Sequence, residues 1–196
     1  MSQALLASPL VSIAIFLVIF VSDSLLTVHA VRLYKAGADR LIALEGGYEL
    51  NPVWAKDVDR LRALPPRFVA GLALYSLLIW ALWYLSVGLS WFPRGYAFFA
   101  GAILLVQGPI HMRHIRNIVV FRHAKNQEGI QGRIQYTRRF SYKVSAVELL
   151  AFSTLYLVLA FLSESLLLLG GAFGTAVLAF RSYQASRKIS SQPGRE

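Results

Sequence analysis

Asp23 is the residue of this chain most in need of a chemical explanation, because an acid stands inside a long apolar run, PLVSIAIFLVIFVSDSLLTVHAV. A charged side chain in the middle of a membrane span costs about 2.5–3.5 kcal/mol on insertion scales, so such residues usually bind an ion, a proton or a polar substrate. Thr27 lies four residues later, on the same helix face. The alternative is a buried hydrogen-bonded pair that fixes helix packing.

A second group of polar side chains lies in the segment QGPIHMRHIRN. Gln107, His111 and His114 are spaced i, i+4, i+7, which places an amide and two imidazoles on one helix face. Two histidines three residues apart could share a metal ion, with Asp23, Glu49 or Glu148 as a further ligand. The alternative is a set of polar groups at the membrane boundary that hydrogen-bond to other helices or to lipid headgroups.

Arg113 and Arg116 fall on roughly the opposite face of the same segment, and Pro109 predicts a bend in the helix just before them. We expect these arginines to reach lipid phosphates or to pair with Glu49 or Glu148. Glu148 would lie about one turn inside a later span, where the helix dipole also favours an acid. Arg138 and Arg139 are further candidates for contact with lipid headgroups.

The segment that follows the first apolar run contains Gly47-Tyr48-Glu49-Leu50-Asn51-Pro52. Asn51 followed by proline is typical of a helix N-cap and first helical position. Trp54, Val58 and Leu61 then recur at i, i+4, i+7 among charged residues. This pattern predicts a short amphipathic helix at the membrane interface, ended by Pro65-Pro66. Glu49 and Asn51 therefore have a capping role as the alternative to a binding role.

Composition indicates the class of protein that positions these residues. The 196 residues are 56% hydrophobic and only 15% charged, with a mean hydropathy of +0.53, and the apolar residues are gathered into long runs. We therefore expect an all-α integral membrane protein. The chain has no cysteine, which excludes disulfides and thiolate chemistry. Its net charge of +10 fits loops beside anionic lipid headgroups better than a nucleic-acid partner.

A span needs about 20 mostly apolar residues, and five such spans are predicted. From residue 144 to 183 the chain is almost wholly apolar, too long for one crossing, so Ser163-Glu164-Ser165 is expected to form a tight turn. Residues 1–184 would form one transmembrane domain and 185–196 a basic cytoplasmic tail. The N-terminal residues show no signal-peptide pattern and are expected to begin a retained helix. The expected spans are about 10–31, 68–92, 96–121, 144–162 and 166–183.

The lysines and arginines predict the orientation of the spans. They are numerous in the first and third loops and in the tail, whereas the second loop has Arg94 alone and the turn at Ser163–Ser165 has none. The N-terminus is therefore expected outside and the C-terminus inside, in the cytoplasmic membrane. The third loop, 123–143, could form a small hairpin or a flexible basic segment. Gly170, Gly171 and Gly174 give the fifth span a face for close helix contact, within the chain or between chains.

The motif Asp23-Ser24-Leu25-Leu26-Thr27 followed by Gly47-Tyr48-Glu49-Leu50-Asn51-Pro52 resembles the D-x-x-x-T … G-x-E-x-N-P signature of a family of small, uncharacterised prokaryotic multi-pass membrane proteins. The resemblance covers the first quarter of the chain. It implies no particular activity or cofactor. It implies only that Asp23, Thr27, Glu49 and Asn51 act as one unit.

Three functions remain open from the sequence. The first is a small transporter or channel subunit, shared around the axis of a homo-oligomer, with a polar pocket facing the cytoplasm. Asp23, Thr27, Glu49 and Asn51 would line that pocket together with the polar residues of the third and fourth spans, Gln107, His111, His114 and Glu148. The second is a non-catalytic subunit of a larger membrane complex. The third is a membrane-embedded, lipid-modifying enzyme that uses histidine and carboxylate chemistry.

Overall fold

The computed structural model describes residues 7–49, 51–127, 129 and 132–190, and these residues are largely helical. Among them, five helices are long and apolar enough to span a membrane. This confirms the predicted all-α architecture with five spans, and the protein is a multi-pass membrane protein. The five spans are Pro9–Lys35, Pro66–Gly88, Arg94–Asn126, Arg138–Ser163 and Leu166–Ile189.

The first span is helix α2 (Pro9–Lys35), which begins where Ser8 Oγ accepts a hydrogen bond from the Leu10 N–H. Residues 1–6, at the start of the expected first helix, lie outside the described residues. The second span consists of α4 (Pro66–Trp83) and a π-helical turn, η2 (Tyr84–Gly88). Between the two spans lie a short 3-10 helix, η1 (Ala38–Arg40), the strand β1 (Ile42–Leu44) and the helix α3 (Pro52–Asp59).

The third span is interrupted, since α5 (Pro93–Leu104) and α6 (Gln107–Asn126) are separated by Leu105 and Val106. The interruption follows from Pro109, which has no N–H to offer to the carbonyl four residues earlier. That carbonyl, of Leu105, instead accepts from the Gly108 N–H at 3.1 Å and from the Tyr156 hydroxyl at 3.1 Å. The predicted bend before Pro109 therefore has partners for its freed backbone group.

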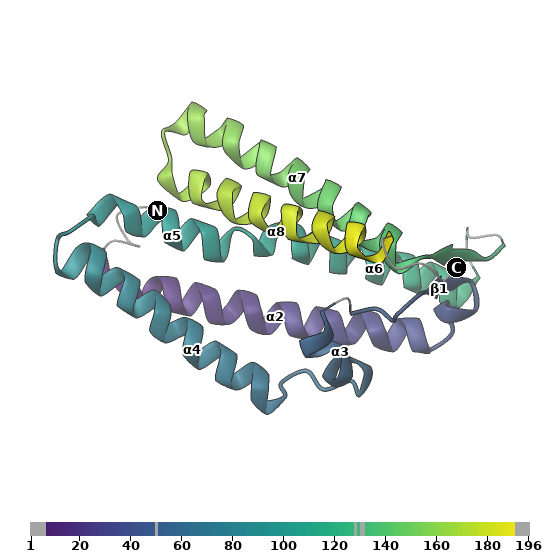
Figure 1. Cartoon of the computed structure of the whole chain (residues 1–196). Helices are drawn as coiled ribbons and strands as arrows, with labels where there is room; N and C mark the ends of the chain where they lie inside the picture. The colour runs from purple at the N-terminus through teal and green to yellow at the C-terminus, as the bar shows by residue number, and fades with distance from the viewer. Residues whose placement is uncertain (1–6, 50, 128, 130–131, 191–196) are drawn as a thin grey trace.

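The last two spans, α7 (Arg138–Ser163) and α8 (Leu166–Ser190), form an antiparallel hairpin (Figure 1). The predicted turn is present, with Glu164 in the left-handed conformation at φ 50°. The hairpin packs on α5 through glycines. A Cβ on Gly170 would lie 1.9 Å from the Phe98 carbonyl oxygen, and one on Gly101 would lie 1.9 Å from that of Leu167. The glycine face predicted from the sequence is thus used inside one chain.

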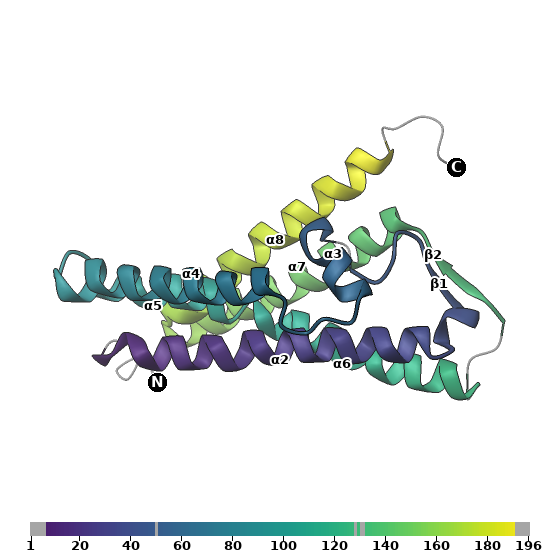
Figure 2. The ribbon, with the colours of Figure 1, turned by 90° about the horizontal axis from the view of Figure 1, so that it is seen from below.

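Two buried clusters mark the two ends of the bundle. One joins α2, α4, α5 and α8 around Phe16, Ile79 and Tyr96. The other joins the C-terminal ends of α2 and α6 to the loop elements, around Ala30 and Phe121. In Figure 2, α8 diverges from α2 toward its C-terminal end, so the α7–α8 hairpin stays close to α5 but moves away from α2. The candidate site lies in the space between α2 and α6 on one side and the α7–α8 hairpin on the other.

The loops and helix ends differ from the expectations in four places. The third loop forms no hairpin in its described part: β2 (Ile134–Tyr136) pairs in parallel with β1, with Ile42 opposite Ile134. The ends of α2 and α6 bring the two loops side by side, which allows this pairing. Helix α3 ends at Asp59, so Leu61, with φ 58°, is not on its face. Helix α7 begins at Arg138 rather than at 144, and α8 continues through the first residues of the expected tail; residues 191–196 lie outside the described residues.

Candidate functional site

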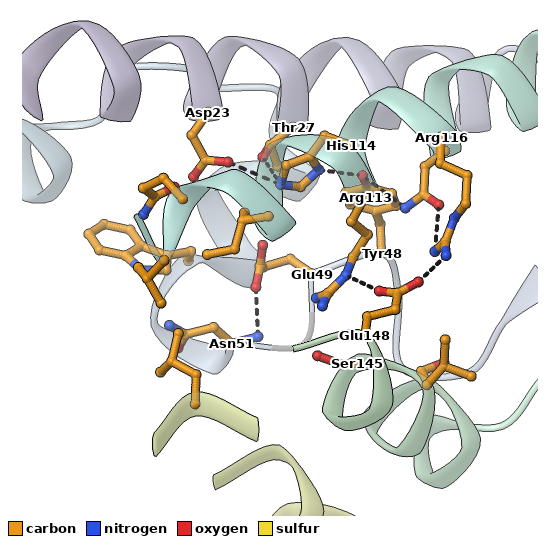
Figure 3. Close-up of a pocket in the computed structure, with 18 of the residues that line it drawn as sticks. Asp23, Thr27, Tyr48, Glu49, Asn51, Arg113, His114, Arg116, Ser145 and Glu148 are labelled. Atoms are coloured by element: carbon orange, nitrogen blue, oxygen red, sulfur yellow. Dashed lines mark hydrogen bonds and ion pairs between the residues drawn. The ribbon is translucent and has the colours of Figure 1, made fainter. Parts of the chain in front are cut away.

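A cavity of about 910 Å³ lies between α2 and α6 on one side and α7 and α8 on the other, and the loop after β1 closes one end (Figure 3). Its wall changes character along its length. The part near α5 is apolar, with Ile103, Val106 and Leu178 among its lining residues. The part near the loops is strongly polar. Cavities of this size with a few convergent polar groups are typical ligand sites. The lining residues that carry charge or titrate are Asp23, Tyr48, Glu49, Tyr75, Arg113, His114, Arg116, Tyr136 and Glu148.

His114 is the centre of the polar part. It is 7% exposed, and its Nε2 lies 3.1 Å from Thr27 Oγ1 and 3.2 Å from Asp23 Oδ1. Its Nδ1 lies 2.7 Å from the hydroxyl of Tyr48. The i, i+4 spacing of Asp23 and Thr27 is what presents both side chains to the same imidazole nitrogen.

A chain of hydrogen bonds links Arg116, Asn117 and Tyr48 to His114. Arg116 Nη2 can only donate, and it faces Asn117 Oδ1 at 3.4 Å. Asn117 Nδ2 then donates to the Tyr48 hydroxyl at 3.3 Å. The Tyr48 hydroxyl can then donate its own proton to His114 Nδ1 or accept a second hydrogen bond from it. Burial raises the pKa of Tyr48, which keeps the phenol neutral and able to donate.

His111 makes a separate set of contacts. Its Nδ1 donates to the Gln107 carbonyl at 2.8 Å, since a carbonyl can only accept. Its Nε2 lies 2.8 Å from Ser22 Oγ. Both ring nitrogens are therefore engaged with protein groups, and His111 is not one of the residues lining the cavity. The two histidines predicted on one face both meet α2, one helical turn apart.

Arg113 and Arg116 reach across to α7, where both bind Glu148. Arg113 Nε is 2.9 Å from Glu148 Oε2, and Arg116 Nη1 contacts Glu148 Oε1. The side chains of Arg113 and Glu148 are about three-quarters buried, at 23% and 24% exposure. Among the described residues, this pair of bonds is the ionic link between α6 and α7. Of the two acids considered for these arginines, the structure selects Glu148.

The loop that carries Tyr48 and Glu49 is held by the strand pair and by a tight turn. Gly46 and Gly47 have φ values of +81° and +89°, in the left-handed region that favours glycine. Glu49 Oε1 accepts a hydrogen bond from the Asn51 N–H at 2.8 Å, and Asn51 Oδ1 caps α3 by accepting from the Val53 N–H at 3.1 Å. The predicted cap is confirmed. Leu50, between these residues, lies outside the described part of the chain.

Burial also raises the pKa of Glu49, which is half-buried above the cavity. Its hydrogen bond from Asn51 and the nearby His114 and Arg113 act in the opposite direction, and the negative charge of Asp23 acts in the same direction as burial. The loss of water is the largest of these effects. Glu49 is therefore easier to protonate than an ordinary glutamate.

Three buried polar atoms of the cavity wall make no hydrogen bond to any described residue. They are Asp23 Oδ1, Gln107 Oε1 and Arg113 Nη2. Asp23 Oδ1 is near His114 Nε2, but the contact lacks hydrogen-bond geometry. An unsatisfied buried polar group costs about 1–3 kcal/mol. Two acceptors and one donor without hydrogen bonds therefore belong to residues that line the same cavity.

Sequence reasoning placed seven of its eight candidate binding residues around this cavity, and His111 is the exception. It missed Tyr48 and Asn117, which orient His114. Tyr48 stands inside the motif that pointed to Glu49 and Asn51, which was a usable signal. Asn117 had no comparable signal. Arg138 is half-buried, with its guanidinium 6.0 Å from the centre of the Tyr142 ring, and Arg139 is exposed.

The suggested metal site involved His111, His114 and Asp23. The structure brings Asp23 to His114 but directs His111 to Ser22. Within the described part of the chain, no three histidine, aspartate or glutamate side chains converge as a group that could hold a metal ion.

Comparison of the chain with protein-family models, with curated proteins and with solved structures gives no match. The functional argument therefore depends on the geometry of the cavity.

Proposed function

We propose that the protein is a small transporter of the cytoplasmic membrane that binds a polar solute in the cavity between α2, α6, α7 and α8. The observation that carries this proposal is that three buried polar atoms of residues lining the cavity make no hydrogen bond to any described residue, namely Asp23 Oδ1, Gln107 Oε1 and Arg113 Nη2. Because polar groups inside a membrane protein are costly, their concentration around one cavity favours a solute site over a purely structural role.

The ends of the helices support an orientation for this transporter. The two loops rich in lysine and arginine, and the C-terminal end of α8, lie at the same end of the bundle (Figure 1). By the positive-inside rule this end faces the cytoplasm, with the N-terminus outside. The polar part of the cavity is then on the cytoplasmic side. We further propose that Arg138 and Arg139, near that end, contact anionic lipid headgroups.

The other two functions have less support. Both nitrogens of His114 and of His111 are engaged with protein groups, so neither presents a free base to a substrate, as an enzyme would need. The glycine face that suited a subunit of a larger complex is covered by α5.

Reconstitution in liposomes tests the proposal. Fluxes of H⁺, Na⁺, K⁺ and of a small organic amine would be followed with the corresponding dyes or radiolabel. We expect at least one flux above that of protein-free liposomes, and a loss of about tenfold or more in the Asp23→Asn variant, because an intramembrane acid carries the solute site. The matched control is Asp59→Asn, at an exposed acid at the end of α3. No flux of any of these species would contradict the transporter proposal.

A further inference from the structure

A second, smaller cavity adjoins the first. It has a volume of about 140 Å³ and lies among α2, α3 and α4. The two cavities share their acids and a group of aromatic residues, so the carboxylates stand where the two spaces meet. The shared lining residues are Phe20, Asp23, Thr27, Glu49, Trp54 and Tyr75.

The charges along the larger cavity favour a cation at this junction. At the far side Arg113 and Arg116 both bind one acid, Glu148. The described residues at the junction, which line both cavities, include two acids, Asp23 and Glu49, and no lysine, arginine or histidine. The faces of the aromatic rings among these residues also attract an organic cation.

The unpartnered atoms restrict the kind of cation. Gln107 is 5% exposed and lines the cavity, and its Oε1 makes no hydrogen bond to any described residue. Asp23 Oδ1 also makes no hydrogen bond, although His114 Nε2 lies 3.2 Å from it. Both atoms are acceptors, so the group that satisfies them must donate. A protonated amine has N–H donors, whereas a quaternary ammonium has none.

We propose that the cavity binds a protonated primary or secondary amine with an apolar body, its N–H groups donated to Asp23 and Gln107. The apolar body fits against the part of the wall formed by Ile103, Val106 and Leu178. This inference rests on the proposed solute site and names the class of molecule that it takes.

Calorimetry on the full chain in lipid nanodiscs tests the proposal with three probes that share one apolar body. Phenethylamine carries the N–H donors, N,N,N-trimethylphenethylammonium keeps the charge without them, and 3-phenylpropionate carries a negative charge. We expect phenethylamine to bind about 10- to 100-fold more tightly than the other two, because hydrogen bonds to a charged group are lost with either. Equal binding of the trimethyl probe, or preferential binding of the carboxylate, would overturn the proposal.

Two variants locate the binding. Asp23→Asn and Gln107→Leu should each weaken phenethylamine, while Asp59→Asn should leave its affinity unchanged. Thermal unfolding of each variant shows whether it is folded. If Asp23→Asn does not fold, the affinity of Gln107→Leu for the three probes still tests the proposal. Binding without liposome flux would remove the transporter proposal and leave this inference standing. Flux of another solute, with no binding of phenethylamine, would overturn this inference alone.

Discussion

At the scale of single residues, His114 is held by more protein groups than any other titratable side chain of the cavity. The Tyr48 hydroxyl lies against one nitrogen, and the other faces Thr27 and Asp23. An imidazole engaged at both nitrogens has little freedom to rotate. His114 therefore joins Tyr48 of the first loop to Asp23 and Thr27 of α2.

Glu49 gives a prediction at the same scale. Its raised pKa means that the folded protein binds a proton more tightly than the unfolded chain does. The stability from this group is therefore fully present below the ordinary glutamate pKa of about 4.5 and is lost as the pH rises through the raised value. We expect the unfolding temperature of the wild type to fall over this range more than that of Glu49→Gln.

Thermal unfolding in detergent between pH 4 and pH 8 measures this difference. Glu45→Gln is a suitable control, since Glu45 is an exposed glutamate of the same loop. A Glu49→Gln variant whose unfolding temperature depends on pH as steeply as that of the wild type would contradict the prediction.

At the scale of elements, the contact between α5 and α8 fixes where the bundle is closed. Gly101, Gly170 and Gly174 let the two backbones approach closely, and no side chain separates them. Close backbone contact through small residues is a common way to pack helices in a membrane. Because the hairpin is fixed at this end, the space at the other end remains for the cavity.

Gly170→Ala tests that contact. Its Cβ would lie 1.9 Å from the Phe98 carbonyl oxygen, so the two helices would have to separate. We expect a loss of about 1–3 kcal/mol or more in the free energy of unfolding, as for overpacked cores. Gly71→Ala in α4 is the matched control. No atom lies within 4 Å of its new Cβ, and alanine should stabilise that helix by about 0.5–1 kcal/mol. Titration with denaturing detergent measures both, and a neutral Gly170→Ala would contradict this account.

The same elements show what a sequence can predict here. Long apolar runs determined the five spans, Asn51-Pro52 determined the start of α3, and the turn at Ser163–Ser165 followed from span length. The pairing of β1 with β2 was not predictable, because three-residue strands from separate loops carry no periodic pattern. The sequence also could not predict that His114, rather than His111, lies beside Asp23. Which residue of a helix faces its neighbour depends on how the helices pack, and residue spacing does not determine this.

At the scale of the whole molecule, the proposed orientation can be tested because the chain has no cysteine. Glu164→Cys places a single thiol in the exposed turn between α7 and α8, and Arg133→Cys places one in the loop before β2. With the basic loops inside, a membrane-impermeant maleimide should label Glu164→Cys in intact cells and Arg133→Cys only after permeabilisation. The reverse pattern would overturn the orientation.

The parallel pair of β1 and β2 has a consequence for assembly. The turn that presents Tyr48 and Glu49 follows directly after β1, yet the partner of β1 is synthesised only after the third span. During synthesis the first loop, which carries Glu49, can therefore form this strand pair only after two more spans have been made. The cavity is in this sense completed late in synthesis, because early and late parts of the chain both line it.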